Sequence, residues 1–287
     1  QCFGDGGFDG GWISSDDGVY GWAMPQLYGE IAINNLTLQA GHFYTIMGYE
    51  VVPAPDNFFY SHSYLLNDEP FTHMGALATY QLSEKVSITG GWTNGWDNGW
   101  IDPTGGSTFL GGITTNLSDG MCFTYTTSFG DLYNRNDQGY NSQRPVFMQS
   151  MVFQWDLNDC WTYVFQSDFR TDVEKYAALS DNTIYRSYGI ANYLFVELNE
   201  QWAAGVRAEW FRNENGVSGQ SISTANYTEV STGLNWRPYN CLVIRPELRW
   251  DWTDADPSIQ PFDPVNGSDF GDHSWQFTGG CDFILLY

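Results

Sequence analysis

The residues best suited to polar chemistry in this sequence are its arginines. Nine arginines and two lysines occur among 287 residues. A guanidinium keeps its charge and can bind a carboxylate through two parallel hydrogen bonds. Five arginines lie on the polar face of segments with strand-like alternation, which we predict to line an interior as a basic wall: Arg170, Arg186, Arg207, Arg245 and Arg249.

Two interpretations of this basic wall are open. Acidic residues occupy similar faces of the same or neighbouring segments, at Glu209, Glu247 and Asp251. In the first interpretation they pair with the arginines across strands and form a structural ladder. In the second, the arginines face an acidic loop from elsewhere in the chain. The two interpretations are compatible.

The connection at residues 46–71 supplies such a loop. Pro53 and Pro55 exclude it from a sheet, because proline cannot donate to a strand ladder. Its length and aromatic content are typical of a folded functional loop and not of a disordered one. We predict that it folds into the interior and forms a constriction with these residues: Glu50, Asp56, Phe58, Phe59, Tyr60, Asp68 and Glu69.

Motifs for metal binding or catalysis are missing from the sequence. The four histidines are His42, His62, His73 and His273, and neither they nor the five cysteines have the spacing of a zinc site. No HExxH or GxSxG motif occurs. We therefore predict no catalytic residue, no metal site and no cofactor.

Composition favours an all-β protein at a membrane. The chain has 31 glycines, and aromatic residues make up 17% of it, more than one soluble core requires. No apolar run is long enough for a transmembrane helix. The net charge of −23 disfavours a nucleic-acid partner, because phosphate binding requires a basic surface.

The chain divides into about thirteen strand-like segments. Tight turns and long polar loops alternate between them, which is typical of outer-membrane barrels with short periplasmic turns and long external loops. We predict strands at residues 22–33, 36–45, 72–82, 86–94, 108–116, 121–129, 145–155, 160–171, 184–196, 202–212, 227–236, 241–253 and 274–287.

The faces of these segments indicate lipid outside and water inside. Apolar residues alternate with charged ones, as Leu248 and Trp250 do with Glu247 and Arg249. A soluble barrel with its apolar face inward is the competing interpretation. We predict that aromatic residues form girdles at the two membrane boundaries: Trp161, Trp202, Trp210, Trp250, Trp252 and Tyr287.

The predicted fold class is a transmembrane antiparallel up-and-down β-barrel. Residues 1–287 form one barrel domain in this interpretation. Since bacterial barrels have even strand numbers, we expect further strands before residue 1, with sixteen in all. The chain ends in alternating apolar residues and Tyr287, which resembles the signal read by the barrel assembly machinery.

Several stretches of residues 22–100 resemble one known family. They are AMPQLY at 23–28, GHFYTI at 41–46, GYEVVPAPDNFFYSH at 48–62, EPFTH at 69–73, GGW at 90–92 and WD at 96–97. In these stretches the chain is similar to the OmpL-like β-barrel porin family, the second β-barrel porin family. The resemblance implies a pore-forming barrel with strands before residue 23 and assigns no catalytic residue.

These observations predict a porin of the bacterial outer membrane. It would contact outer-membrane lipid and let small hydrophilic solutes and ions diffuse through a water-filled channel. One alternative is a structural or adhesive surface barrel with a plugged lumen, and another is a barrel enzyme. Whether the chain forms a homo-oligomer is left open.

Overall fold

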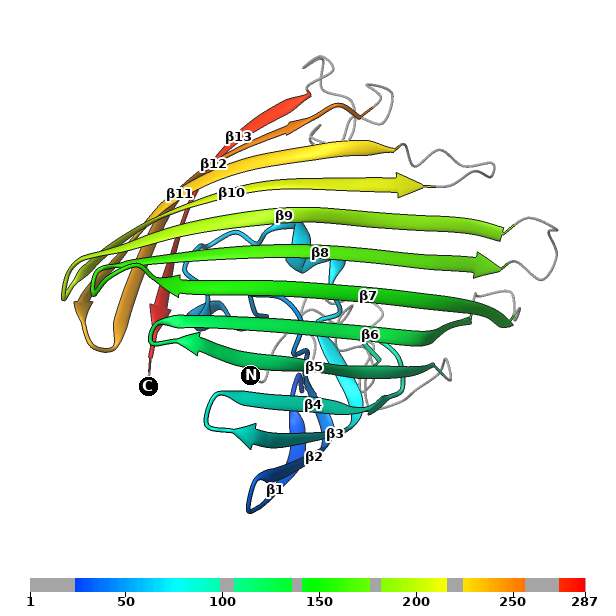
Figure 1. Ribbon diagram of the computed structural model, residues 1–287. Helices are drawn as coiled ribbons and strands as arrows, with labels where there is room; N and C mark the ends of the chain where they lie inside the picture. The colour runs from blue at the N-terminus through cyan, green and yellow to red at the C-terminus, as the bar shows by residue number, and fades with distance from the viewer. Residues whose placement is uncertain are drawn as a thin grey trace.

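The structure is a computed structural model that describes residues 24–98, 106–135, 141–175, 182–215, 224–255 and 274–286. It consists mainly of β-strands (Figure 1). The strands are β1 (Leu27–Ile33), β2 (Leu36–Tyr44), β3 (Thr72–Ser83), β4 (Val86–Thr93), β5 (Ser107–Ser118), β6 (Met121–Arg135), β7 (Asn141–Asp156), β8 (Trp161–Lys175), β9 (Asn182–Asn199), β10 (Trp202–Asn215), β11 (Ala225–Tyr239), β12 (Leu242–Thr253) and β13 (Trp275–Leu285).

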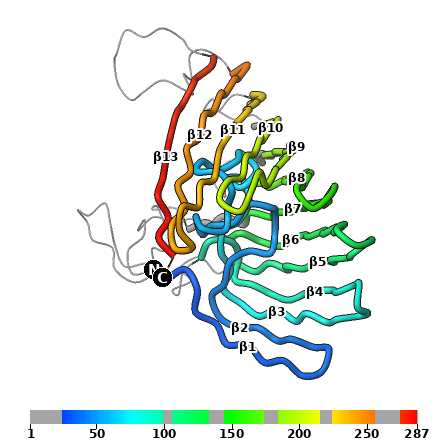
Figure 2. The backbone as a smooth tube through the Cα atoms, turned by 90° about the vertical axis from the view of Figure 1, so that its left-hand side faces the viewer, coloured from blue at the N-terminus to red at the C-terminus, as the bar shows by residue number. Residues whose placement is uncertain are grey.

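All thirteen strands belong to one sheet in which each strand pairs with its sequence neighbours. Every pairing is antiparallel. The sheet curves strongly, with β1 and β13 as its two edges (Figure 2). This is the predicted up-and-down topology, and the predicted thirteen strands of this chain are confirmed.

Connections of two to four residues join alternate strands, as predicted. The turn between β1 and β2 is Asn34–Asn35, and Asn34 has a φ of 53°. Asparagine tolerates this left-handed conformation, which two-residue hairpin turns require. The other end of the sheet carries the longer connections, among them residues 45–71 between β2 and β3.

Strands β6 to β10 are longer than the sequence predicts. Strand β9 has 18 residues and β7 has 16, whereas the predicted strands have about nine to thirteen. Residues 130–135 and 141–143, predicted as part of a polar loop, extend β6 and β7. The prediction ended each strand where apolar alternation stops, but backbone pairing does not depend on apolar side chains.

The two faces of the sheet differ as the alternation predicts. On β10, Val206 is 44% exposed, whereas its neighbour Arg207 is fully buried. On β12, Leu248 is 45% exposed and Glu247 is buried. The convex face is thus apolar and open, and the concave face carries the charges. No helix in the described ranges is long and apolar enough to cross a membrane.

The core lies between the concave face and the connection from β2 to β3. Residues 46–71, called here the docked segment, lie on the concave side of the sheet (Figure 2). Phe59 and Leu65 of this segment pack with Val164, Ala191 and Tyr193 of β8 and β9. A second cluster joins Met47 to Phe43, Leu77, Leu110 and Met148. The chain therefore folds one of its own loops into the hollow of the sheet.

Candidate functional site

The docked segment contains two short helices. Pro53 precedes the first, η1 (Ala54–Asp56). The second, α1 (Tyr64–Asp68), begins after Ser63, whose hydroxyl accepts a hydrogen bond from the backbone N–H of Leu66 at 3.1 Å. A serine in this position satisfies an N–H group that has no partner within the helix. These helices fix the shape with which the segment meets the wall.

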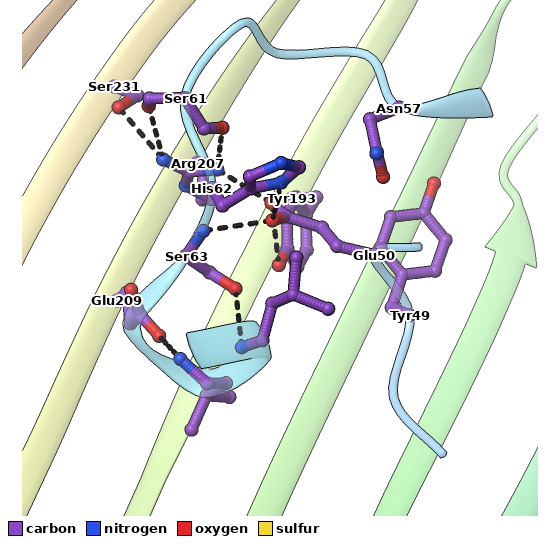
Figure 3. Close-up of polar contacts among 12 residues, drawn as sticks. Tyr49, Glu50, Asn57, Ser61, His62, Ser63, Tyr193, Arg207, Glu209 and Ser231 are labelled. Carbon is purple, nitrogen blue, oxygen red and sulfur yellow. Dashed lines mark hydrogen bonds and ion pairs between the residues drawn. The ribbon is translucent and has the colours of Figure 1, made fainter. Parts of the chain in front are cut away.

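The central contact joins Glu50 of the segment to Arg207 of β10 (Figure 3). Glu50 Oε1 lies 2.6 Å from Arg207 Nη1, and Glu50 Oε2 accepts the backbone N–H of Ser63 at 2.8 Å. Burial alone would raise the pKa of Glu50, but the charge of Arg207 and the hydrogen bond from Ser63 lower that pKa to about 2. Glu50 is therefore ionised at neutral pH.

Arg207 binds both the segment and the wall. Its Nε forms an ion pair with Glu229 of β11, and its Nη1 donates to the carbonyl oxygen of Ser61 at 3.0 Å. The guanidinium also lies 5.0 Å from the ring centroid of Phe59, a distance that permits a cation–π interaction. Arg207 is thus a buried hub and does not line open water.

Two wall carboxylates bind backbone N–H groups of the segment. Glu209 of β10 accepts the N–H groups of Tyr64 and Leu65, each at 2.7 Å, at the start of α1. Glu247 of β12 accepts the N–H of Ser61 at 2.9 Å. Each of these hydrogen bonds satisfies a backbone N–H group that would otherwise be buried without a partner. The acids of the wall are therefore anchors for the segment.

Arg245 and Arg249 of β12 bind carbonyl oxygens of the segment. Arg245 Nη1 donates to Ala54 O at 2.9 Å, and Arg249 Nη1 donates to His62 O at 2.6 Å. Each arginine also has a carboxylate partner in the wall, which is Asp282 for Arg245 and Asp251 for Arg249. Both interpretations of the basic wall therefore describe part of the network: strand-to-strand pairs exist, and the same arginines hold the loop.

The far end of the segment is bound by Arg170 and Ser187. Arg170 Nη1 donates to the backbone and side-chain oxygens of Asp68, at 2.9 and 3.2 Å. The hydroxyl of Ser187 on β9 donates to the other carboxylate oxygen of Asp68. Burial raises the pKa of Asp68 even though Arg170 lowers it. These contacts place the C-terminal end of α1 against β8 and β9.

Aromatic packing completes the contact. The ring centroid of Phe58 lies 4.8 Å from that of Phe195, and the Tyr49 centroid lies 4.9 Å from that of Tyr193. Gly205 makes room for this packing, since a Cβ atom there would lie 2.6 Å from a ring carbon of Phe58. The segment therefore buries apolar and charged groups together.

Three predicted residues differ from their expected roles. Glu69 was expected to face arginine, but the neighbouring charge with the largest effect on it is the buried carboxyl group of Asp168. Asp56 and Tyr60 are exposed, and the Tyr60 ring lies beside Gly280 of β13. The sequence could not distinguish segment residues that face the wall from those that face outward, because the segment has no regular periodicity.

The predicted position of Arg186 on the interior face is wrong. It was placed on the interior face, but it is exposed and its neighbour Ser187 contacts Asp68 on the concave side. Since side chains alternate along a strand, Arg186 lies on the convex face of β9. The assignment was wrong because the sequence near residue 184 does not alternate clearly enough to give the phase.

The five predicted girdle tryptophans lie on the convex face. Trp161 and Trp252 are 38% and 43% exposed. The Trp202 ring stacks on that of Trp236 with centroids 5.3 Å apart, and Trp210 and Trp250 pack on Tyr188 and Phe277. Their position at the lipid boundary stays a prediction. Tyr287 lies outside the described residues.

Sequence reasoning missed Gln166 as a contact of the segment. Its side-chain oxygen accepts the backbone N–H of Tyr49 at 3.1 Å, and its side-chain nitrogen donates to Glu69 at 2.7 Å. Gln166 alternates in phase with Arg170 and so shares its interior face, but nothing local in the sequence indicates a partner 97 residues away. Ser63, which precedes an apolar helical turn, carried a recognisable N-cap signal.

Part of the concave face away from the segment carries threonine hydroxyl groups. Thr79 and Thr89 are linked at 2.9 Å between β3 and β4, and Thr114 and Thr124 at 3.3 Å between β5 and β6. Such side chains present hydrogen-bond donors and acceptors without a charge. A solute passing between this wall and the docked segment would meet hydroxyl groups on one side.

Comparisons with known proteins agree with this geometry. The model of the family described as putative beta-barrel porin-2, OmpL-like, matches residues 3–286. No curated protein matches the chain.

Solved structures with a similar fold are outer-membrane proteins. The outer membrane channel DcaP of Acinetobacter baumannii has a TM-score of 0.62 and 8% identity, covering 85% of this chain and 72% of that one. The anion-selective porin from Comamonas acidovorans has a TM-score of 0.55 and 6% identity, covering 81% and 69%. A trimer form of OmpT from Vibrio cholerae has a TM-score of 0.54 and 9% identity, covering 83% and 72%.

Proposed function

The chain belongs to the OmpL-like putative β-barrel porin-2 family, and from that premise we propose that it forms an outer-membrane channel through which small hydrophilic solutes and ions diffuse. The apolar convex face faces lipid in this proposal, and the polar concave face surrounds water. The family favours a channel over a barrel enzyme.

The observation that carries the proposal is the position of the docked segment. A loop that is bound to the concave face by Arg170, Arg207, Arg245 and Arg249 narrows the space that the sheet encloses. We propose that residues 46–71 set the narrowest section of the channel. Loops inserted into barrels limit solute size in porins generally, and that likeness is one of architecture.

We further propose a weak preference for cations. The chain carries a net charge of −23, and clefts with one sign of charge concentrate ions of the other sign. The arginines of the wall do not offset this charge at the channel surface, since Arg207 and Arg245 are buried against the segment. The preference should weaken as salt screens the charges.

A homo-oligomer is proposed on the basis of the similar structures. The solved OmpT of Vibrio cholerae includes a trimer form. Association through the convex face would leave each channel and its docked segment intact. Cross-linking of the protein in outer-membrane vesicles, followed by gel analysis, measures the oligomeric state.

A plugged surface barrel is the second candidate function. The observation that favours it is the density of buried polar contacts between segment and wall, which would also suit a permanent plug. Single-channel recordings in planar bilayers separate the two. Discrete conductance steps that scale with salt support the porin, whereas a folded, inserted protein that gives no steps supports the plug.

A further inference from the structure

The docked segment meets the wall at one place where two carboxyl groups face each other. Glu69 follows α1 and is 4% exposed, and Asp168 of β8 is also 4% exposed. Gln166 lies between them: its side-chain nitrogen donates to Glu69 Oε1 and to Asp168 Oδ2, both at 2.7 Å. The two acids therefore share one amide group.

The Gln166 amide has no hydrogen left for the remaining carboxyl oxygens. The amide oxygen of Gln166 accepts the backbone N–H of Tyr49, which fixes the orientation of the amide. Both of its hydrogens are then used, one for each carboxyl group. Glu69 Oε2 and Asp168 Oδ1 remain buried without a hydrogen-bond partner. The hydroxyl of Ser150 on β7 lies beside Asp168 and can donate to it, but Glu69 Oε2 has no such donor. A buried carboxylate oxygen without a donor is costly unless the carboxyl group is protonated or shares a proton with its neighbour.

No cation in the described part of the chain pairs with either carboxyl group. Arg170 is bound to Asp68 and Asp172. Arg207 is bound to Glu50 and Glu229. The uncharged Ser150 of β7 lies directly opposite Asp168.

The other neighbours of Glu69 add to its electrostatic cost. Asp68 and Glu50 of the segment add negative charge near Glu69. His62 lies 3.6 Å from Glu50 and not beside Glu69. Burial, and then the charge of Asp168, raise the pKa of Glu69 well above its usual range.

The backbone around the pair fits this arrangement. Gly48 has a φ of +76°, a conformation that glycine adopts without strain. A Cβ atom at Gly48 would lie 2.0 Å from Glu69 Oε2. The orphaned oxygen is thus pressed against the chain and closed off from water.

We propose that Glu69 and Asp168 share a single proton, and that this proton fastens the end of the docked segment to the wall. The protonated carboxyl group donates a hydrogen bond to the other, ionised carboxyl group. No covalent bond other than the O–H bond changes. Loss of the proton leaves two negative charges in contact, which drives Glu69 and α1 away from β8. The shared proton is inferred from these contacts alone. Only its effect on conduction rests on the proposed channel function.

The direction of the pH dependence follows from linkage. The docked state keeps a proton that a released Glu69 gives up above its ordinary pKa of 4.5. The contribution of the Glu69–Asp168 contact to docking is therefore complete below that pKa and weakens as the pH rises above it. For one proton, the ratio of released to docked segment increases by up to about tenfold per pH unit.

Infrared spectroscopy of the wild-type protein in lipid tests the proton directly. At about pH 7 we expect the C=O stretching band of a buried protonated carboxyl group. The band should be reduced in Glu69→Gln and in Asp168→Asn. A wild-type spectrum without such a band would overturn the proposal. This holds also if a metal ion bound between the two carboxylates takes the place of the proton.

Hydrogen exchange of the α1 amides tests the fastening. After correction for the intrinsic exchange rates, wild-type exchange should increase between about pH 5 and about pH 9. Glu69→Gln should remove this increase, because glutamine donates to Asp168 at every pH. The control Glu247→Gln, which alters another wall acid that binds the segment, should keep it. Equal pH dependence in the wild type and Glu69→Gln would contradict the proposal, and Asp168→Asn gives the same test from the wall side.

Discussion

Oε1 of Glu50 lies 2.6 Å from Nη1 of Arg207, although 157 residues separate them in the sequence. Glu50 belongs to the connection after β2, and Arg207 belongs to β10. Both side chains are almost fully buried. This pair joins the loop to the opposite part of the same sheet, and it explains how a long polar connection is held inside the hollow of the barrel wall.

Replacing Arg207 with methionine should destabilise the protein. The change leaves Glu50 and Glu229 buried without their cation, and breaking a buried ion pair costs about 3–5 kcal/mol. The free energy of unfolding, measured by urea titration in lipid vesicles, checks this value.

Arg237→Met is the matched control for that experiment. Arg237 and its partner Glu197 are 40% and 55% exposed, and exposed pairs contribute about 0–1 kcal/mol. Equal losses in the two variants would mean that Arg207 is not a buried hub.

Strong acid should release the N-terminal part of the docked segment. Because the pKa of docked Glu50 is about 2 and its usual value is 4.5, its contribution to docking is complete above pH 4.5 and is lost as the pH falls toward 2. After correction for the intrinsic exchange rates, exchange of the Ser63 amide, which donates to Glu50, should increase on acidification. Glu50→Gln should show faster exchange already at neutral pH and little further change.

The strand pattern was readable from the sequence because alternation is local. Leu248 and Arg249 lie on opposite faces because successive side chains of a strand alternate. This assignment requires no information about the neighbouring strands. Strand ends were less predictable: Leu132 and Arg135 lie in β6, though their sequence reads as loop. Ladder hydrogen bonds continue wherever two backbones run side by side, whatever the side chains.

The site was only partly predictable, because its partners are distant in sequence. Acids in the segment and arginines in the wall indicated charge complementarity, and the pairs Glu50 with Arg207 and Asp68 with Arg170 agree with it. The contact of Glu69 with Asp168 contradicts simple complementarity. A sequence gives the charge of each residue, but the burial that favours a shared proton exists only after folding.

Arginine at position 206 should destabilise the barrel. Val206 is exposed on the convex face between Trp202 and Trp210, and a charge at the middle of the bilayer costs roughly 2–4 kcal/mol. Folding into lipid vesicles, followed by denaturant titration, measures the loss.

Tyr239→Arg is its control, since Tyr239 is 70% exposed at the turn end of β11, where a charge costs roughly 0–1 kcal/mol. If Val206→Arg is as stable as the wild type, the convex face does not contact the bilayer core.

The channel should prefer cations modestly. In a salt gradient at low ionic strength, the reversal potential should have the sign of cation flow, and it should approach zero as the salt concentration rises. Asp56→Asn, which neutralises an exposed acid of the docked segment, should reduce the preference without altering buried contacts. An anion-selective reversal potential at low salt would disprove this charge argument.

The most direct test of the central claim is the single-channel conductance of a variant that lacks residues 54–67. The strand ladder remains intact in this variant, so heat-modified gel mobility and strand content should match those of the wild type. Because the docked segment would no longer narrow the channel, we expect a larger conductance than in the wild type under the same salt. An unchanged conductance in the folded variant would contradict the claim that this segment sets the narrowest section.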